Sequence, residues 1–370
     1  MSVLWGKGVS IVELTVAPLS IPLREPFVIA SGRLEATRAA LVRATLVGEG
    51  GRRATGLGES AALPPVTRED QPDLLRLIAE AAAGLRGEVL TRDEELDALL
   101  RERLPAGGVA RAGVETAILD AAARLAGVPL YRALGGGAAP ALLTDITLSI
   151  SEPARMAEAA VRHARAGFDC FKVKVGRDWR ADLASLQAVA TVVPGARFRL
   201  DANAGFTADE ALALLDAALG DGLTIECYEQ PCAAGDLAGL ARVAARTTVP
   251  VVADESFRGP ADLDRLLAAR AAGGVNLKLT KLGGPLAALA LGRRARGEGL
   301  RLMAGAMVET RVGLLAMAHV VTALGGVDWV DLDTAFLLAS DPFTGGWQAD
   351  GPDLRLDEAP GLGVALAPAA

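Results

Sequence analysis

The chain has 370 residues, of which 51% are hydrophobic and 22% charged, and its net charge is −7. This composition excludes an intrinsically disordered chain, and the acidic balance gives no reason to expect a nucleic-acid partner. Three cysteines are too few for a disulfide framework, and neither a secretory signal nor a membrane span is visible. We therefore expect a cytoplasmic protein of two or three domains with no membrane partner.

The first part of the chain predicts a small α+β unit. Apolar and polar residues alternate over 9–22 and 39–47, the glycine-rich stretch 48–51 provides a turn, and a further strand follows, so a β meander is expected over 11–63. Helical spacing follows, and Thr67 with Asp70 resembles a capping box at the start of the first helix. A later helix is expected over 111–125, ended by glycine and proline.

From residue 144 onwards, short apolar runs alternate with alanine-rich amphipathic stretches every 25–30 residues or so. Thr207 and Glu210 form a second candidate capping box at the head of one such stretch. This rhythm indicates repeated βα units, and eight parallel strands joined by right-handed crossovers close into a barrel. The candidate strands are 145–150, 171–175, 198–201, 225–229, 251–254, 275–278, 300–304 and 329–332.

Lysine is rare in this chain. Only five of the 38 basic residues are lysines, and four of them lie in two short segments, FKVKVG around Lys172 and Lys174 and NLKLTKLGG around Lys278 and Lys281. Lysine can lose its proton in a protein and arginine cannot, so the retained lysines hint at chemistry that needs a neutral amine. Chance retention on a solvated face is the alternative, and the count alone does not decide between them.

Three acidic residues end consecutive predicted strands, namely Asp201, Glu229 and Asp254. The carboxyl ends of barrel strands form the catalytic face, so these carboxylates converge there. Unpaired, they would repel one another and resist burial, whereas oxygen ligands of this kind suit Mg²⁺ or Mn²⁺. A single acid at a strand end is usually a loop or cap residue, but three in succession favour a metal site.

The lysines occupy positions suited to two-sided proton transfer. Lys172 and Lys174 are two residues apart on one strand, so both side chains point to the same face, about 6.6 Å apart at their stems. Repulsion between two ammonium groups at that distance lowers one pKa by about 0.5 to 2 units. Lys278 ends the sixth strand, on the opposite side of a closed barrel from the second. The alternative is that Lys172 and Lys174 lie on the outer face of their strand and are exposed to solvent. Lys281 is assigned a structural role.

With these motifs assembled, the sequence resembles the enolase superfamily and in particular its muconate-lactonizing subgroup. The resemblance rests on an ordered set of segments, which are LYRALGG (130–136), KVK (172–174), DAN (201–203), EQP (229–231), ADES (253–256) and KLTKLGG (278–284). It implies an α/β fold: a modified TIM barrel, (β/α)7β, over 131–340, with an N-terminal α+β capping domain over 1–130. A C-terminal segment, 341–370, is expected to pack back on the capping domain.

The resemblance also assigns roles to the site residues. It implies that Lys174 and Lys278 are the two bases, that Lys172 assists them, and that Asp201, Glu229 and Asp254 bind Mg²⁺, with Asn203 in support. The implied chemistry is removal of a proton next to a carboxylate through a metal-stabilised enediolate, the mechanism with which this superfamily is generally associated. Homo-oligomers are common in the subgroup, so a homo-oligomer is expected, although the sequence does not fix its size.

Substrate-side residues favour one branch of the subgroup. The segment VDLDT places Asp331 and Asp333 two apart, and two carboxylates without a metal suit an α-ammonium group. The dipeptide epimerases are similar in carrying such an Asp-x-Asp, and Thr147 and Glu309 also match substrate-contacting positions. Gly32 stands where epimerases of Ala-Glu have an arginine, which favours a neutral or hydrophobic side chain. We therefore expect Mg²⁺-dependent epimerisation of L,L-/L,D-dipeptides at the α-carbon of the C-terminal residue by two-base 1,1-proton transfer.

Other functions remain open at this point. Within the subgroup, an N-acylamino acid racemase, an o-succinylbenzoate synthase or a cycloisomerase would use the same lysines and metal ligands on a substrate without a free amine. A Schiff-base aldolase would use a barrel lysine without a metal. A binding protein would retain the ligand without exchanging its α-proton.

Overall fold

The computed structural model describes residues 4–30, 32–105 and 108–367, so the outermost three residues of the predicted first and last segments lie outside it. The N-terminal part contains a four-stranded antiparallel sheet in the order β5-β4-β1-β6. Its strands are β1 (Val9–Leu19), β4 (Arg38–Val47), β5 (Arg53–Ala62) and β6 (Val89–Leu90). A separate hairpin is formed by β2 (Pro22–Ile29) and β3 (Gly32–Ala36), and a 3₁₀ turn spans Glu49–Gly51. The predicted meander is therefore confirmed.

Three helices cover this sheet, α1 (Gln71–Leu85), α2 (Asp93–Arg103) and α3 (Gly108–Ala126). Helix α3 lies unusually close to β5, because a Cβ atom placed on Gly58 would be 1.9 Å from the carbonyl oxygen of Gly113. The predicted capping box at Thr67 is wrong: the cap of α1 is Asp70, which pairs reciprocally with Asp73. Thr67 instead accepts a hydrogen bond from the backbone of Leu63 and donates to the carbonyl of Glu69, because the chain turns there before the helix begins.

The second part is a barrel of eight parallel strands in sequential order. The strands are β8 (Ile146–Leu148), β9 (Cys170–Lys174), β10 (Arg197–Asp201), β11 (Thr224–Glu229), β12 (Val251–Ala253), β13 (Gly274–Leu277), β14 (Arg301–Ala304) and β15 (Trp329–Val330). Each predicted strand is present, and its ends differ from the prediction by at most two residues. A parallel bridge between Thr144 and Val330 joins the first strand to the last and closes the sheet.

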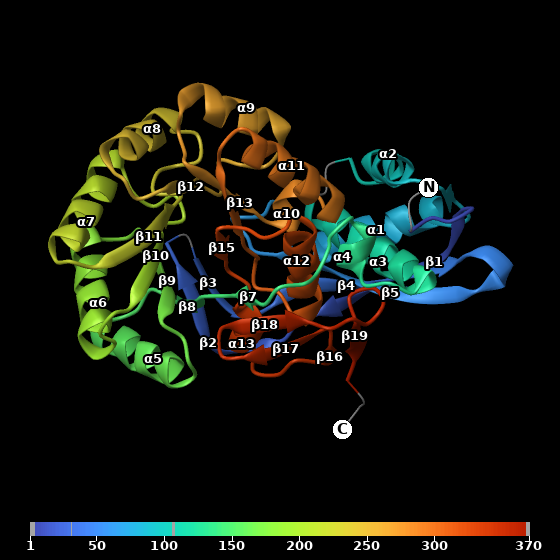
Figure 1. Cartoon of the computed structure of the whole chain (residues 1–370), viewed down its shortest axis with the longest axis horizontal. Helices are drawn as coiled ribbons and strands as arrows, with labels where there is room; N and C mark the ends of the chain where they lie inside the picture. The colour runs from blue at the N-terminus through green and yellow to red at the C-terminus, as the bar shows by residue number, and fades with distance from the viewer. Residues whose placement is uncertain (1–3, 31, 106–107, 368–370) are drawn as a thin grey trace.

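Helices follow the strands around the outside of the barrel (Figure 1). They are α5 (Pro153–Arg165), α6 (Trp179–Val192), α7 (Ala208–Gly220), α8 (Leu237–Arg246), α9 (Pro260–Ala269), α10 (Leu279–Leu282), α11 (Pro285–Gly297), α12 (Arg311–Ala323) and α13 (Thr334–Leu337). The predicted capping box of Thr207 and Glu210 begins α7. The α/β class and the (β/α)7β barrel with its N-terminal cap are thus confirmed. No helix in the described ranges is both long and apolar enough to cross a membrane.

The remaining elements connect the two parts. Helix α4 (Leu130–Ala133) and β7 (Leu142–Leu143) lead into the barrel, and the last elements are β16 (Phe343–Gly345), β17 (Trp347–Asp350), β18 (Asp353–Leu356) and β19 (Val364–Leu366). Strand β18 pairs with β7, and the backbone N–H of Leu362 donates to Asp120 on α3 at 2.7 Å. Arg124 on the same helix donates to the carbonyl of Val364 at 2.7 Å. The C-terminal segment therefore contacts the N-terminal part; domain boundaries at residues 130 and 340 are our proposal.

Inside the barrel, a small apolar cluster lies beneath part of the acidic row. Cys227, Val252, Met303 and Trp329 form a buried cluster of their own. Glu229, Asp254 and Asp331 each come two residues after one of these, so they point to the same side one step nearer the carboxyl end. This cluster therefore lies beneath the three acids, while Arg199 and Lys172 on the neighbouring strands are in register with Cys227.

Candidate active site

A small cavity lies at the carboxyl ends of the barrel strands. Its polar lining includes Lys174, Lys278, Asp331, Thr147 and Asn203, all of which were predicted from the sequence. The remaining wall is largely apolar: Phe27 and Ile29 from β2, Leu63 and Val66 after β5, and Ala306, Met307 and Val308 after β14. The N-terminal part thus supplies half of the apolar wall over a polar barrel mouth.

The three predicted lysines lie in the barrel interior and reach neighbouring carboxylates. The ammonium nitrogen of Lys174 is 2.6 Å from Asp201, and that of Lys278 is 2.9 Å from Asp254. Lys172 lies deeper and contacts Glu229 at 2.6 Å and Asp201 at 3.2 Å. Because β9 and β13 are the second and sixth of eight sequential strands, Lys174 and Lys278 face the cavity from opposite sides.

Charge pairing, more than burial, sets the ionisation of these groups. Burial by itself lowers the pKa of Lys172, but Asp331, Glu229 and Asp201 outweigh it and hold that pKa well above its ordinary value. Burial raises the pKa of Asp201, whereas Lys174 and Lys172 lower it. The effect of the lysines is the larger one, so this pKa lies below its ordinary value. From the sequence, repulsion between Lys172 and Lys174 was expected to lower one lysine pKa. At Lys172 this repulsion is weaker than the attraction of the neighbouring carboxylates.

The three predicted metal ligands form a continuous row. Asp201 and Glu229 pair directly across β10 and β11, and Asp254 follows at the end of the next strand, β12. Lys172 contacts both Asp201 and Glu229, and Lys278 contacts Asp254 and lies 3.9 Å from Glu229. All three are fully buried oxygen donors that already attract cationic groups. This donor set fits a hard divalent cation.

A different trio has the closest carboxylates. Among the described residues, Asp145, Asp331 and Asp333 each offer an oxygen within 4.8 Å of the others. Asp331 contacts Lys172 at 2.7 Å, and Asp333 accepts a hydrogen bond from the backbone N–H of Thr147 at 2.5 Å. Burial and the neighbouring Asp331 raise the pKa of Asp333 to about 6. The predicted Asp-x-Asp pair thus lies together, with a third acid that the sequence did not single out.

Several supporting residues were missed from the sequence. Lys281, assigned a structural role there, contacts the carboxylate of Asp254 and also donates to its carbonyl at 2.6 Å. Its spacing from Lys278, three residues on a short helix, was the available signal. Asn276 donates to Glu229 at 2.6 Å. Gln230, in the EQP segment, accepts from the backbone N–H of Asp254 at 2.9 Å and so fixes the following turn.

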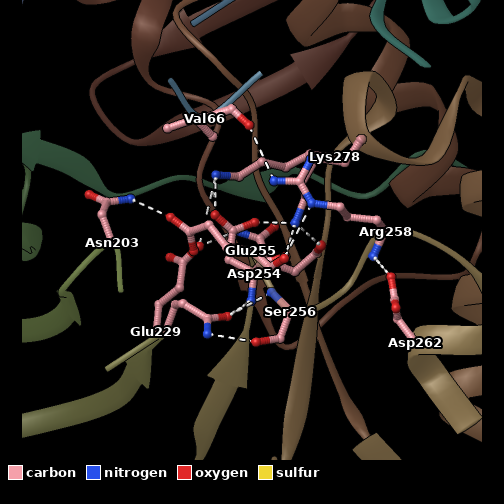
Figure 2. Close-up of polar contacts among 12 residues, drawn as sticks. Val66, Asn203, Glu229, Asp254, Glu255, Ser256, Arg258, Asp262 and Lys278 are labelled. Carbon is pink, nitrogen blue, oxygen red and sulfur yellow. Dashed lines mark hydrogen bonds and ion pairs between the residues drawn. The ribbon is translucent and has the colours of Figure 1, made fainter. Parts of the chain in front are cut away.

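Figure 2 shows that this turn also contacts the loop after β5, at Val66. Arg258, after β12, donates to the carbonyl of Val66 at 3.2 Å and to that of Glu255 at 3.3 Å. Asn203 reaches Glu255 at 3.3 Å from the other side. The loop from the N-terminal part is therefore tied to the same turn that carries Asp254.

Two further predicted positions do not line the cavity directly. Glu309 is buried and accepts from the backbone N–H of Met307 at 2.9 Å, so it supports the wall. Burial and Glu59 raise the pKa of Glu309 to about 8. Glu59, from β5, accepts a hydrogen bond from the backbone N–H of Thr310 at the start of α12. Gly32 pairs in the β2–β3 hairpin with Ile29, which lines the cavity. Their substrate roles remain predictions.

Comparisons with known proteins agree with this geometry. Residues 11–135 match the mandelate racemase / muconate lactonizing enzyme N-terminal domain, and residues 155–370 match the enolase C-terminal domain-like family. The chain belongs to this branch of the enolase superfamily. An L-Ala-D/L-amino acid epimerase of Populus trichocarpa is 37% identical over 93% of this chain and 82% of its own length.

Two solved structures of this superfamily are similar over nearly the whole chain. A substrate-liganded L-Ala-D/L-Glu epimerase from Bacillus subtilis has a TM-score of 0.92 and 32% identity, covering 97% of this chain and 100% of that one. A dipeptide epimerase from Enterococcus faecalis V583, complexed with Mg and L-Leu-L-Tyr, has a TM-score of 0.90 and 33% identity, covering 96% and 99%. The fold and the dipeptide-epimerase relationship thus rest on whole-chain similarity.

Proposed function

We propose that this chain is a Mg²⁺-dependent dipeptide epimerase that inverts the α-carbon of the C-terminal residue. The observation that carries the proposal is the position of Lys174 and Lys278, which face one cavity from opposite strands, with Asp331 at the same cavity. Two amines on opposite faces suit the removal of a proton from one side of a carbon and its return from the other.

In the proposed reaction the neutral amine of one lysine takes the α-proton, and the ammonium of the other donates a proton to the opposite face. The roles exchange for the opposite epimer, so the enzyme works in both directions. Asp201, Glu229 and Asp254 would hold the metal ion, Mg²⁺ or alternatively Mn²⁺. When bound, the ion supplies positive charge next to the substrate carboxylate, where negative charge develops. Lys172 holds Glu229 and Asp201 in place by its contacts to both.

The cavity wall supports a neutral or hydrophobic side chain on the epimerised residue. Phe27, Ile29, Leu63, Met307 and Val308 offer apolar surface, and of the described residues that line the cavity from the N-terminal part none is charged. A carboxylate side chain buried there would lack a counter-charge. Dipeptides ending in leucine, valine or an aromatic residue are therefore our proposed substrates, in a cytoplasmic homo-oligomer.

The test is a dipeptide library incubated in D₂O with Mg²⁺ and read by mass spectrometry. Deuterium should enter the α-position of the C-terminal residue, and Ala-Leu should react faster than Ala-Glu. If N-acetylated dipeptides were turned over as well as free ones, an acylamino acid racemase would replace this proposal. Binding without deuterium incorporation would replace it with a binding protein.

A further inference from the structure

The carboxylate Asp145 lies directly behind the Asp331–Asp333 pair and has no role in the proposed reaction. It precedes β8, two residues before Thr147, so the two side chains lie on the same, inner face of the strand. Its backbone N–H donates to the carbonyl of Val330 at 3.2 Å, beside the end of β15 from which Asp331 and Asp333 follow. Closure of the barrel therefore brings the three acids together.

These three carboxylates carry more negative charge than their partners neutralise. Lys172 contacts Asp331 at 2.7 Å, and Arg199 contacts Asp145 at 2.9 Å. Both cations are shared, Lys172 with two other acids and Arg199 with Glu226 at 2.9 Å. Across the described ranges no other basic side chain forms an ion pair with the trio. When all three acids are ionised, the cluster is therefore short of at least one positive charge.

Two oxygens of the cluster also lack donors. Asp145 and Asp333 are both 0% exposed, yet Oδ1 of each has no hydrogen-bond partner among the described residues. A buried carboxylate oxygen without a donor is costly unless a ligand or a proton satisfies it. Burial and Asp331 raise the pKa of Asp145 well above its ordinary value, as expected for such an oxygen. The missing positive charge and the unpartnered oxygens point to a cationic ligand that donates hydrogen bonds.

We propose that Asp145 is the third carboxylate of the ammonium subsite and supplies the excess negative charge that makes a free amine on the substrate necessary. This inference rests on the proposed function. Asp331 touches the ligand from the cavity, whereas Asp145 acts from behind it, as a positioning residue. An ammonium group fits better than a second divalent ion, because it brings three N–H donors and a single charge, whereas Mg²⁺ demands six oxygens and retains water.

The experiment compares two ligands that differ only in this charge, Ala-Leu and isobutyryl-Leu, in which a methyl group replaces the ammonium. Calorimetry with Mg²⁺ present gives the ratio of their Kd values. We expect Asp145→Asn to reduce the preference for Ala-Leu about tenfold, because the asparagine cannot become negatively charged when the ammonium enters this desolvated site. The ratio is internal to each variant, so partial misfolding cancels.

Two further variants make the result decisive. Asp331→Asn should also reduce the ratio, whereas Asp169→Asn, an exposed acid paired with Arg197, should leave it as in the wild type. An unchanged ratio in Asp145→Asn, alongside a reduced one in Asp331→Asn, overturns the inference and leaves the proposed function intact. The inference is also overturned if each chain binds a second Mg²⁺ and Asp145→Asn abolishes that second binding. A wild-type protein that does not prefer Ala-Leu contradicts the proposed function itself.

Discussion

The two sides of the active-site cavity use the same residue type in opposite ways. On the side of Asp201 and Asp254, burial raises the carboxyl pKa values but the nearby lysines hold them below their ordinary range. On the side of Asp145 and Asp333, burial and neighbouring acids raise the carboxyl pKa values, whereas at Asp331 burial is outweighed by Lys172 and the pKa is lowered. Both sides are fully buried. The difference teaches that neighbouring charge, more than burial, decides whether these acids are ionised before a ligand arrives.

The comparison assigns each side a different cation. Asp201 and Asp254, which lysine ammonium groups hold ionised, suit a divalent ion, and Glu229 between them has a pKa raised by burial and by Asp201. Acids that are short of donors suit the ammonium of the substrate. Three changes, from the largest expected effect to the smallest, test that assignment.

The largest effect should come from the lysine side. Lys174→Ala and Lys278→Ala should each lower the rate of epimerisation about 1,000-fold, since each removes one of the two proton carriers. Each variant should still exchange the α-proton of one epimer with D₂O, and the two variants should retain opposite epimers, as read by mass spectrometry. Lys7→Ala, which removes an exposed ion pair with Glu49, is the control. Loss of the same epimer in both variants would place the two amines on one face of the substrate.

A smaller effect should follow from the metal ligands. Glu229→Gln should weaken Mg²⁺ binding, measured by calorimetry without substrate, by more than the roughly 10- to 100-fold that loss of an outer-shell partner costs. Chelation of the metal should abolish turnover in the wild type, and added Mg²⁺ should restore it. The matched control is Glu226→Gln on the same strand, whose carboxylate pairs with Arg197 and Arg199 away from the cavity. Equal Mg²⁺ affinity in both variants would remove Glu229 from the ligand set.

The smallest effect is a pH dependence on the ammonium side. The pKa of Asp333 is raised to about 6, so its carboxyl group is neutral below that pH and negative above it. The affinity for Ala-Leu should therefore rise as pH increases from 5 to 7, by at most about tenfold per unit, while the substrate amine stays protonated. Isobutyryl-Leu should show a flatter profile in the same calorimetric titration. Parallel profiles for the two ligands would show that Asp333 does not face the ammonium.

Much of the barrel follows from local patterns in the sequence. The strands of β8 to β15 could be predicted because each is a short apolar run of fixed spacing, and a parallel barrel places every strand end on one face. For the same reason, the positions of Asp201, Glu229, Asp254, Lys174 and Lys278 at the strand ends could be predicted, and their roles stay predictions. The cap of α1 could not, because Thr67 and Asp70 both fit the pattern and only the course of the backbone separates them.

The sequence by itself determined which residue types stand at the strand ends, and hence the lysines, the acids and the chemistry they suit. Only the tertiary structure decided which of these groups are neighbours. Asp145 and Asp331 are far apart in the chain, and they meet because Thr144 pairs with Val330 to close the barrel. Ionisation depends on distances between charges across strands, and such distances do not exist until the chain has folded.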